Sequence, residues 1–546
     1  MRNWKKSCVF IFAALTVLNF AGCGGAGGSN VTPQKDTYTI GGTVSGLSVK
    51  GLVLQDNGGN DLAVSASGAF TFSAPLAGGS AYAVTILTQP SVAQSCAVAS
   101  GSGTASANVT NVQVTCSTEW VWMGGQDTVD QPGIYGTQSV AAATNIPGAR
   151  AGSVTWTDSS GNFWLFGGFD YTSSGNEVDF NDLWKYSPSQ GEWTWVGGSP
   201  TGGAAGVYGK QGQAAASNTP GARDTAASWA DSSGNLWLFG GRLFDSSGNA
   251  YQFNDLWKYN PSTGYWTWVG GSPTAGASGV YGMQGVSATG NVPGARQSAV
   301  SWTDSSGNFW LFGGVGYDST GSGDLLNDLW KYNPNNGQWT WMQGDDFGYQ
   351  SGIYGTQGIA SATNIPGARV AAVNWTDSSG NLWLFGGTGM GTGSVPGELN
   401  DLWRHTPSTG YWTWMSGSTT INTAGFWGTQ GIGTNTTVPG TRQSSASWTD
   451  LSGNLWLYGG TDGDFDFSDL WEYSQSTGEW TWMAGSNLVS QVGSYGTVDI
   501  AAAGDFPGAR DSAAVWTDSS GNFWLFGGQY EDANGNWYTF NDLWEY

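Results

Sequence analysis

Apolar and polar residues alternate in short runs along almost the whole chain. Between residues 38 and 117 the runs YTIGGTV, GLVLQD, GAFTFSA, AYAVTIL and VQVTC are separated by glycine-rich turns. A period of two is typical of strands with one buried face, whereas an amphipathic helix needs a period of about 3.6. We therefore expect residues 37–117 to form a small β-sandwich domain.

The alternation continues from residue 118 onward, but there it repeats as a unit. The stretch WTDSSGNFWLFGG begins at Trp156, Trp302 and Trp516, and near-copies begin at Trp229, Trp375 and Trp448. The arginine of the PGAR or PGTR motif recurs four times at 73 residues and once at 68 residues. Each unit holds four apolar-aromatic runs, which predicts one four-stranded antiparallel sheet per unit and six sheets in all.

The repeated motifs resemble the kelch repeat. The resemblance rests on the arginine, the double glycine after an apolar run, the DLW-x-Y-x-P segment and a tryptophan near the end of each unit. It implies an all-β fold with a six-bladed kelch-type β-propeller at residues 118–546, similar by fold only to the central domain of galactose oxidase. The last unit ends at NDLWEY, and Glu119–Trp122 matches the fourth run of another unit, Glu479–Trp482. We therefore expect an N-terminal strand to close the ring, which removes the free sheet edges.

The first residues of the chain have the pattern of an export signal. Arg2, Lys5 and Lys6 precede an apolar stretch at residues 8–20. This stretch is too short to span a bilayer, which favours a signal peptide over a membrane helix.

The segment that follows resembles the lipobox of bacterial lipoproteins, because Phe20-Ala-Gly precedes Cys23. The resemblance implies a lipoprotein signal peptide at residues 1–22, lipidation of Cys23 and a lipid-anchored place at the outer membrane or cell surface. Residues 23–36 are then a flexible tether. The small domain is similar to the prealbumin-like or immunoglobulin-like spacers near the anchors of bacterial surface proteins. An ordinary signal peptide that is cut elsewhere is the alternative.

The charge of the chain excludes several classes of partner. It has 17 lysines and arginines against 40 aspartates and glutamates, and a net charge of −23. Nucleic acids and anionic lipid surfaces attract cationic proteins, so we expect no nucleic-acid partner and no membrane contact except through the lipid anchor.

Two cysteines other than Cys23 follow the export signal, Cys96 and Cys116. In an exported chain such a pair predicts a disulfide, which stabilises its domain by about 3 kcal/mol. A metal site built on these two thiols is the alternative.

The arginine of each unit is a candidate ligand-binding residue, because the matching arginines of some kelch domains bind acidic peptides. The competing interpretation is that each one pairs with an aspartate of the NDLW motif, such as Asp182 or Asp255, because a buried guanidinium needs partners. The six are Arg150, Arg223, Arg296, Arg369, Arg442 and Arg510.

The segments after each double glycine differ from unit to unit, whereas the DSSGN and STG turns are nearly identical. Loops on a rigid scaffold often carry recognition, so we expect any unique site to draw on these variable segments. Their aromatic and charged residues suit a polar partner such as a glycan or a peptide. The ligand-binding candidates are Tyr171, Arg242, Phe244, Tyr317, Tyr530, Glu531 and Trp537.

One variable segment contains a possible calcium site. Asp462, Asp464 and Asp466 have the alternate spacing of calcium-loop carboxylates. The glycine and the glutamate that an EF-hand loop requires at later positions are missing, so solvated surface acids are the alternative. We expect no other cofactor.

Enzymatic activity stays open as a class. The resemblance includes galactose oxidase, whose copper needs two histidines and a tyrosine crosslinked to cysteine, but this chain has one histidine, His405, and no cysteine after Cys116. We therefore expect no copper-radical chemistry and a structural role for His405. The preferred function is glycan or protein binding at the cell surface. The alternatives are a sugar-modifying enzyme of the sialic-acid epimerase type, which would use arginine and carboxylates at the channel mouth, and a purely structural spacer.

Overall fold

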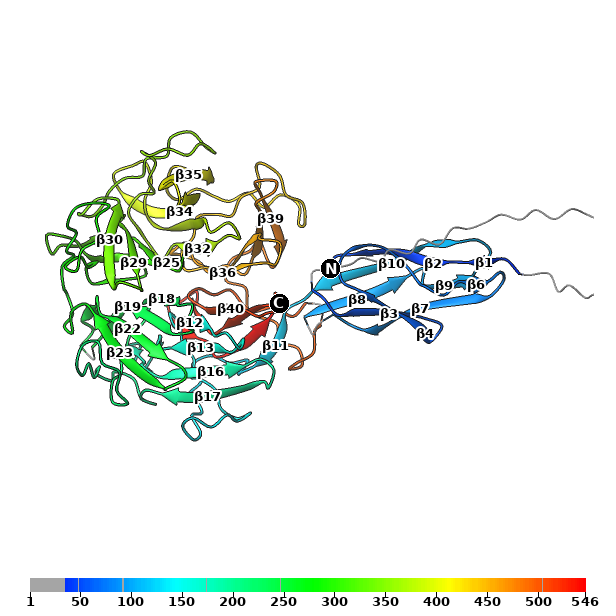
Figure 1. Cartoon of the computed structure of the whole chain (residues 1–546), viewed down its shortest axis with the longest axis horizontal. Helices are drawn as coiled ribbons and strands as arrows, with labels where there is room; N and C mark the ends of the chain where they lie inside the picture. The colour runs from blue at the N-terminus through cyan, green and yellow to red at the C-terminus, as the bar shows by residue number, and fades with distance from the viewer. Residues whose placement is uncertain (1–34, 48, 91–92, 173, 246, 503) are drawn as a thin grey trace, which may run out of the picture.

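The computed structural model describes residues 35–546 apart from residues 48, 91–92, 173, 246 and 503. The predicted signal peptide, Cys23 and most of the predicted tether lie outside the described residues. All regular secondary structure in the described part is β-strand, so the all-β prediction is confirmed (Figure 1). No helix long and apolar enough to cross a membrane occurs among the described residues.

Residues 37–118 form two four-stranded sheets around one apolar core. The sheets have the orders β5-β2-β10-β8 and β4-β3-β7-β9. Their inward-facing residues, such as Ile40, Leu54 and Val112, are buried together, as the alternating sequence predicts. The strands are β1 (Thr37–Tyr38), β2 (Ile40–Ser45), β3 (Leu52–Asp56), β4 (Gly59–Val64), β5 (Gly68–Thr71), β6 (Leu76–Ala77), β7 (Ala81–Thr88), β8 (Gln94–Ala99), β9 (Ser102–Thr104) and β10 (Val109–Thr118).

The predicted disulfide joins two neighbouring strands of this domain. Cys96 of β8 lies directly opposite Cys116 of β10, and their sulfur atoms are bonded at 2.01 Å. The prediction of a Cys96–Cys116 disulfide is therefore confirmed, and the alternative of a metal site on these thiols is excluded.

Residues 121–545 form six antiparallel sheets, numbered here one to six, of which five have four strands and sheet four has a fifth, β31 (Arg369–Val370), at its hairpin (Figure 1). Sheet one has β12 (Val154–Thr157), β13 (Phe163–Phe166), β16 (Leu183–Ser187) and β17 (Glu192–Gly197), and sheet two has β18 (Ala227–Ala230), β19 (Leu236–Phe239), β22 (Leu256–Asn260) and β23 (Tyr265–Gly270). Sheet three has β25 (Val300–Thr303), β26 (Phe309–Phe312), β29 (Leu329–Asn333) and β30 (Gln338–Gln343), and sheet four has β32 (Val373–Thr376), β33 (Leu382–Met390), β34 (Pro396–Thr406) and β35 (Tyr411–Ser416). Sheet five has β36 (Ala446–Thr449), β37 (Leu455–Tyr458), β38 (Leu470–Ser474) and β39 (Glu479–Ala484).

Sheet six takes its strands from both ends of this region. It consists of β40 (Ala514–Thr517), β41 (Phe523–Phe526), β44 (Leu543–Glu545) and β11 (Val121–Gly124). In the antiparallel pairing of β11 with β44, Trp122 lies opposite Trp544. The early segment therefore supplies the fourth strand of the last sheet.

The first strands of the six sheets adjoin one another in chain order, and β40 adjoins β12 again. A ring of main-chain hydrogen bonds links the residues just before these strands. Each amide of the ring donates to the carbonyl of the preceding member, and the amide of Gly152 donates to the carbonyl of Ser512. The members are Gly152, Thr225, Ser298, Ala371, Ser444 and Ser512, all with positive φ.

The tryptophans fill the spaces between neighbouring sheets. Trp184 is fully buried, and Trp516 of sheet six stacks on Phe163 of sheet one with ring centroids 5.2 Å apart. Trp516 also donates its indole N–H to the carbonyl of Trp164 at 3.2 Å. Equivalent contacts recur between the other sheets, so packing accounts for the repeated tryptophans.

The two ends of the sheets carry different connections. At one end lie the short turns between first and second and between third and fourth strands. In the first of these turns Asp158 accepts the amides of Ser160 and Asn162, and Gly161 has φ 77°. Asp158 therefore caps the turn, and Gly161 supplies the positive φ that the turn requires.

The opposite end carries the connections between sheets and the variable segments, named here hairpins one to six. They comprise residues 169–180, 242–253, 315–326, 388–399, 461–467 and 529–540. Their strands are β14 (Phe169–Tyr171) with β15 (Glu177–Asp179), β20 (Arg242–Phe244) with β21 (Ala250–Gln252), β27 (Val315–Tyr317) with β28 (Gly323–Leu325) and β42 (Gln529–Glu531) with β43 (Trp537–Thr539). In sheet four the hairpin continues β33 and β34, and β24 (Arg296–Gln297) and β31 (Arg369–Val370) extend hairpins three and four.

Candidate functional site

Each repeat arginine is buried in a cluster built around a paired aspartate, named here the arginine node. In sheet one, Nη1 and Nη2 of Arg150 donate to the two carboxylate oxygens of Asp182 at 2.7 and 2.9 Å. Tyr135 and Trp184 donate to the same carboxylate, each at 2.7 Å. Burial opposes the charged form of Arg150, but Asp182 outweighs it and raises the arginine pKa. The guanidinium is therefore held in its charged form by the fold itself.

The node recurs in all six sheets with the aspartates Asp182, Asp255, Asp328, Asp401, Asp469 and Asp542, each fully buried. Arg150, Arg223, Arg296, Arg369, Arg442 and Arg510 are exposed by 1% or less. Because these guanidinium groups are buried and paired, we place none of them in a ligand site. The geometry supports the structural interpretation of these arginines, in which each one pairs with an aspartate of the NDLW motif.

A second group of charged residues lies between hairpins one and two. Unlike the node, it contains more carboxylates than guanidinium groups. Arg242 of hairpin two donates to Glu177 of hairpin one at 2.6 Å and to Asp224, which follows a node arginine. The guanidinium carbon of Arg242 lies 4.3 Å from the ring centre of Phe244. The amide of Phe244 donates to Oδ2 of Asp179 at 2.7 Å, while Oδ1 of Asp179 is buried without a partner in the described structure.

Three carboxylates therefore lie together beside one guanidinium, which pairs with Glu177 and Asp224 but not with Asp179; this group is named here the Arg242 cluster. One oxygen from each of Glu177, Asp179 and Asp224 lies within 4.8 Å of the others. Burial raises the pKa of Glu177 to about 9, although Arg242 opposes the shift. Burial, followed by the charge of Asp224, raises the pKa of Asp179 to about 8. The cluster thus holds exchangeable protons near neutral pH.

A related pair of carboxyl groups lies at hairpins five and six. Asp466 accepts the amide of Glu531 at 2.9 Å, as Asp179 accepts that of Phe244, and Oδ1 of Asp466 is also buried without a partner in the described structure. Burial raises the pKa of Asp466 to about 6 and, together with the charge of Asp466, that of Asp511 to about 8. Here Gln529 occupies the place of Arg242 and donates to Asp511 at 3.2 Å.

Tyr171 of hairpin one connects the two acidic groups. Its hydroxyl donates to Gln529 at 3.0 Å, and burial followed by the charges of Glu177 and Asp511 raises its pKa. Its ring lies 6.4 Å from that of Trp537, which is 37% exposed. Tyr171, Arg242, Phe244 and Trp537, all proposed from the sequence, thus lie on neighbouring hairpins.

The remaining hairpin candidates lie apart from the Arg242 cluster or act through the main chain. Tyr317 lies in β27 of hairpin three. Tyr530 stacks between Tyr538 and Phe540 at 5.3 and 5.4 Å and lines a cavity of about 280 Å³. Glu531 contributes its amide, which it donates to Asp466.

The three aspartates proposed for calcium do not converge. Asp462 accepts the amides of Asp464 and Phe465 and so caps its own turn. Asp466 points instead toward the amide of Glu531 in the next hairpin. Among the described residues, the one group of three or more potential metal ligands is the Glu177, Asp179 and Asp224 group, and Arg242 already lies within it.

His405 is a packing residue. It is 1% exposed and lies between Trp310 and Trp412, with ring centres 5.2 and 4.9 Å away. Burial lowers its pKa to about 3, so the imidazole is neutral at physiological pH. His405 stands at the position that tyrosines such as Tyr332 occupy in other sheets.

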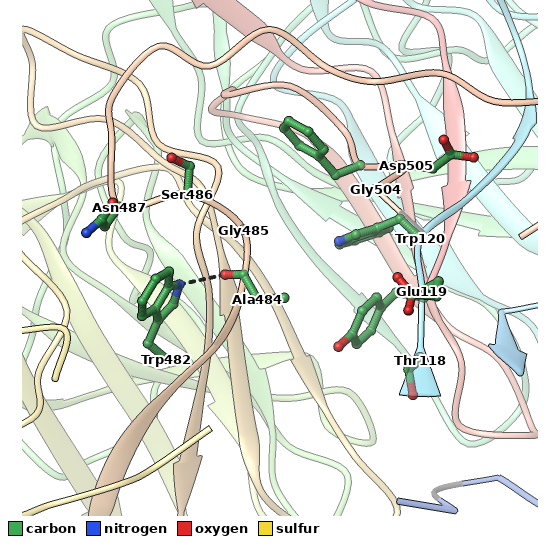
Figure 2. Close-up of a pocket in the computed structure, with 12 residues that line it drawn as sticks. Thr118, Glu119, Trp120, Trp482, Ala484, Gly485, Ser486, Asn487, Gly504 and Asp505 are labelled. Atoms are coloured by element: carbon green, nitrogen blue, oxygen red, sulfur yellow. Dashed lines mark hydrogen bonds between the residues drawn. The ribbon is translucent and has the colours of Figure 1, made fainter. Parts of the chain in front are cut away.

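A cavity of about 430 Å³ opens where sheets five and six meet, with Trp482 and Trp120 on opposite sides (Figure 2). In four other units an asparagine such as Asn145 closes the equivalent place by donating to the carbonyls of Val140 and Trp193. Sheet six has Asp505 there, and a carboxylate cannot donate these bonds. The bonds of this asparagine are therefore missing at the cavity, which Asp505 lines.

Sequence reasoning missed the polar partners of the hairpin candidates, which are the carboxylates Glu177, Asp179, Asp224 and Asp511 and the amide Gln529. Two of them follow the repeat arginine directly, at a place where four other units have Ala151, Gln297, Val370 and Gln443. A comparison of that single position across the six units would have singled out Asp224 and Asp511.

No protein-family model matches the chain, and no curated protein matches it. Among solved structures, one titled "Structure of YjhT" is similar with a TM-score of 0.42 and 14% sequence identity. The similarity covers 75% of this chain and 95% of that chain.

Proposed function

We propose that the chain is a lipid-anchored protein of the outer membrane or cell surface that binds a glycan or protein partner through its hairpin face. In this proposal residues 118–546 are a six-bladed kelch-type β-propeller, closed by the strand that pairs with the end of the chain. The small disulfide-bonded domain holds the propeller away from the anchor.

The supporting observation for binding is the grouping of Tyr171, Arg242, Phe244 and Trp537 on adjacent hairpins. These hairpins differ in sequence at the end of the sheets where the connections are long, whereas the turns at the other end are nearly identical. Aromatic rings next to a guanidinium and carboxylates supply both stacking surfaces and hydrogen-bonding groups for a polar ligand.

The test is thermal unfolding of the full chain with a panel of calcium, sialic acid, neutral sugars, polysaccharides and acidic peptides. A ligand at 100 times its dissociation constant adds about 2.7 kcal/mol of stability, which a melting curve detects. We expect the shift to be lost in Arg242→Ala and kept in Arg404→Ala, whose guanidinium stacks on Trp383 in the body of sheet four. No shift with any member of the panel would reject small-ligand binding and favour a protein partner or a structural spacer.

A sugar-modifying enzyme of the sialic-acid epimerase type is the second candidate. It is favoured by one observation: Glu177 and Asp179 have pKa values raised to about 9 and about 8 beside Arg242, so protonated carboxyl groups are available at neutral pH. Exchange of solvent deuterium into a bound sugar, or interconversion of its anomers, would support catalysis. A ligand that binds at the cluster but stays chemically unchanged would reject it.

A further inference from the structure

Hairpin five is shorter than its five counterparts. It spans residues 461–467, whereas the hairpin of sheet six spans residues 529–540, so five residues are missing. This difference accounts for the one 68-residue interval in the repeat. Because the surrounding connections keep their lengths, the shortened hairpin leaves space at this place on the hairpin face.

A cavity of about 490 Å³ occupies that space, named here the sheet-five recess. Its walls come from hairpin four, hairpin five and the connections on either side, and they include Glu398, Trp427, Asp462, Asp464 and Phe467. The corresponding place in sheet six holds the smaller cavity beside Tyr530, about 280 Å³, where two tyrosines and Phe540 stack.

The recess is acidic and has no positive charge in its walls. Glu398, Asp462 and Asp464 line it, and none of its lining residues is a lysine, arginine or histidine. Oε1 of Glu398 accepts the hydroxyl of Thr388 at 2.7 Å, whereas Oε2 is without a partner in the described structure. Burial and then the charge of Asp462 raise the pKa of Glu398. A cationic group in the recess would relieve this repulsion.

Trp427 breaks the arginine node of the same sheet. In the other five sheets a tyrosine stands at this position and donates to the node aspartate, for example Tyr354 to Asp401 at 2.6 Å. The indole N–H of Trp427 has no acceptor in the described structure. Tryptophan in place of tyrosine at residue 427 therefore removes a buried hydrogen bond to the node aspartate. It also places a larger aromatic surface in the wall of the recess.

We propose that the sheet-five recess binds an amino sugar, with the ammonium group held by Asp462, Asp464 and Glu398 and the sugar ring packed on Trp427. An ammonium group matches the uncompensated carboxylates and the aromatic face. Hydroxyl groups of the ring match Asn422 and Thr423, which also line the recess. The inference rests on the proposed function, since it specifies a glycan chemistry for the hairpin face.

The test is calorimetric titration of the full chain at about pH 6.5, where the amine of a hexosamine is protonated. We expect glucosamine to bind at least tenfold more tightly than glucose or N-acetylglucosamine, and the difference to shrink at high salt. Equal binding of glucose would overturn the role of the ammonium group. Equal binding of butylamine would overturn the role of the sugar ring, and calcium binding without competition by glucosamine would replace the inference with a metal site.

Two variants locate the site. Asp462→Asn with Asp464→Asn should abolish the preference for glucosamine, while Asp532→Asn, a change to a turn aspartate in hairpin six, should not. Replacing residues 461–467 with the sequence of residues 529–540 should fill the recess and abolish binding, with melting temperature as the control for folding.

The variants also separate this inference from the proposed function. Glucosamine binding that survives the longer hairpin but is lost in Arg242→Ala would overturn the recess and keep binding at the hairpin face. If glucosamine does not bind but another member of the thermal panel raises the melting temperature, the recess is likewise overturned and binding at the hairpin face is kept.

Discussion

The arginine node and the Arg242 cluster use the same chemical groups with opposite balance. In the node of sheet three, one guanidinium meets one carboxylate, and Tyr281 and Trp330 donate further hydrogen bonds to it. In the cluster, one guanidinium pairs with two of three neighbouring carboxylates, and a buried oxygen of the third, Asp179, is left without a partner in the described structure. The charged groups of the node thus have their partners within the fold, whereas the cluster has more carboxylate groups than its one guanidinium pairs with.

Repetition explains why the two differ. Every unit must anchor its connection to its third strand, so the arginine–aspartate pair occurs in each sheet, and in five of the six a tyrosine donates to it as well. The hairpins are not required for this anchoring, and their sequences are free to differ. Charged groups with unbalanced partners are expected where a ligand or a proton can complete them, which is why we place function on the hairpins.

Breaking a node should have the largest effect on stability. Asp328→Ala leaves the guanidinium of Arg296 buried without its counter-ion, which costs about 3–5 kcal/mol. Urea unfolding followed by tryptophan fluorescence measures this loss. Lys210→Ala, a change at an exposed residue, should alter the free energy of unfolding by less than about 0.5 kcal/mol. A loss below about 1 kcal/mol in Asp328→Ala would show that the node is not needed for stability.

The cluster should instead appear in the pH dependence of stability. Glu177, Asp179 and Asp511 have folded-state pKa values of about 9, 8 and 8, above the ordinary carboxyl value of about 4. The folded state therefore binds more protons than the unfolded state across this window, so stability falls as the pH rises from about 4 to about 9. The urea midpoint should be lower at pH 9 than at pH 6.

Substitution at the cluster should weaken this pH dependence. The double change Glu177→Gln with Asp179→Asn removes two of the groups and should flatten the fall. Glu472 and Glu545 have pKa values raised by burial to about 7 and about 8 and contribute in the same direction, so a residual slope is expected. An unchanged slope in the double variant would show that the two cluster carboxyls are ionised in the folded state.

The repeated parts of the molecule were predictable from the sequence. Alternating runs predicted the strands, and the matching of Glu119–Trp122 with a fourth run anticipated the pairing of β11 with β44. Each of these predictions depends on a local sequence pattern or on a comparison of one unit with the next. A single sequence contains the information for both.

The candidate site was predictable only in part, because its contacts join different units. Nothing in the local sequence around Glu177 indicates that its partner is Arg242, 65 residues later. The ring of main-chain bonds was missed for a related reason. Thr225 and Ala371 have φ values of 47° and 55°, which their residue types do not suggest. Their conformation goes with hydrogen bonds to the neighbouring units, which the local sequence does not show.

The smallest predicted effect on stability concerns Asp505, which stands where four other units have an asparagine and which we do not place in a binding site. At residue 505 an asparagine would donate to the carbonyl of Trp120, as Asn145 does to that of Trp193 at 3.1 Å. Asp505→Asn should therefore raise the free energy of unfolding by about 1 kcal/mol at pH 7. It should also narrow the cavity between Trp482 and Trp120 (Figure 2).

The pH dependence of this gain distinguishes a missing hydrogen bond from a general effect of charge. Burial raises the pKa of Asp505, so its carboxyl is protonated more readily in the folded state and can then donate one hydrogen bond. The advantage of Asp505→Asn should accordingly shrink as the pH falls toward 4 and grow as it rises. A gain that is constant from pH 4 to pH 8 would mean that the carboxylate does not face these carbonyls, and that the opening between sheets five and six has another cause.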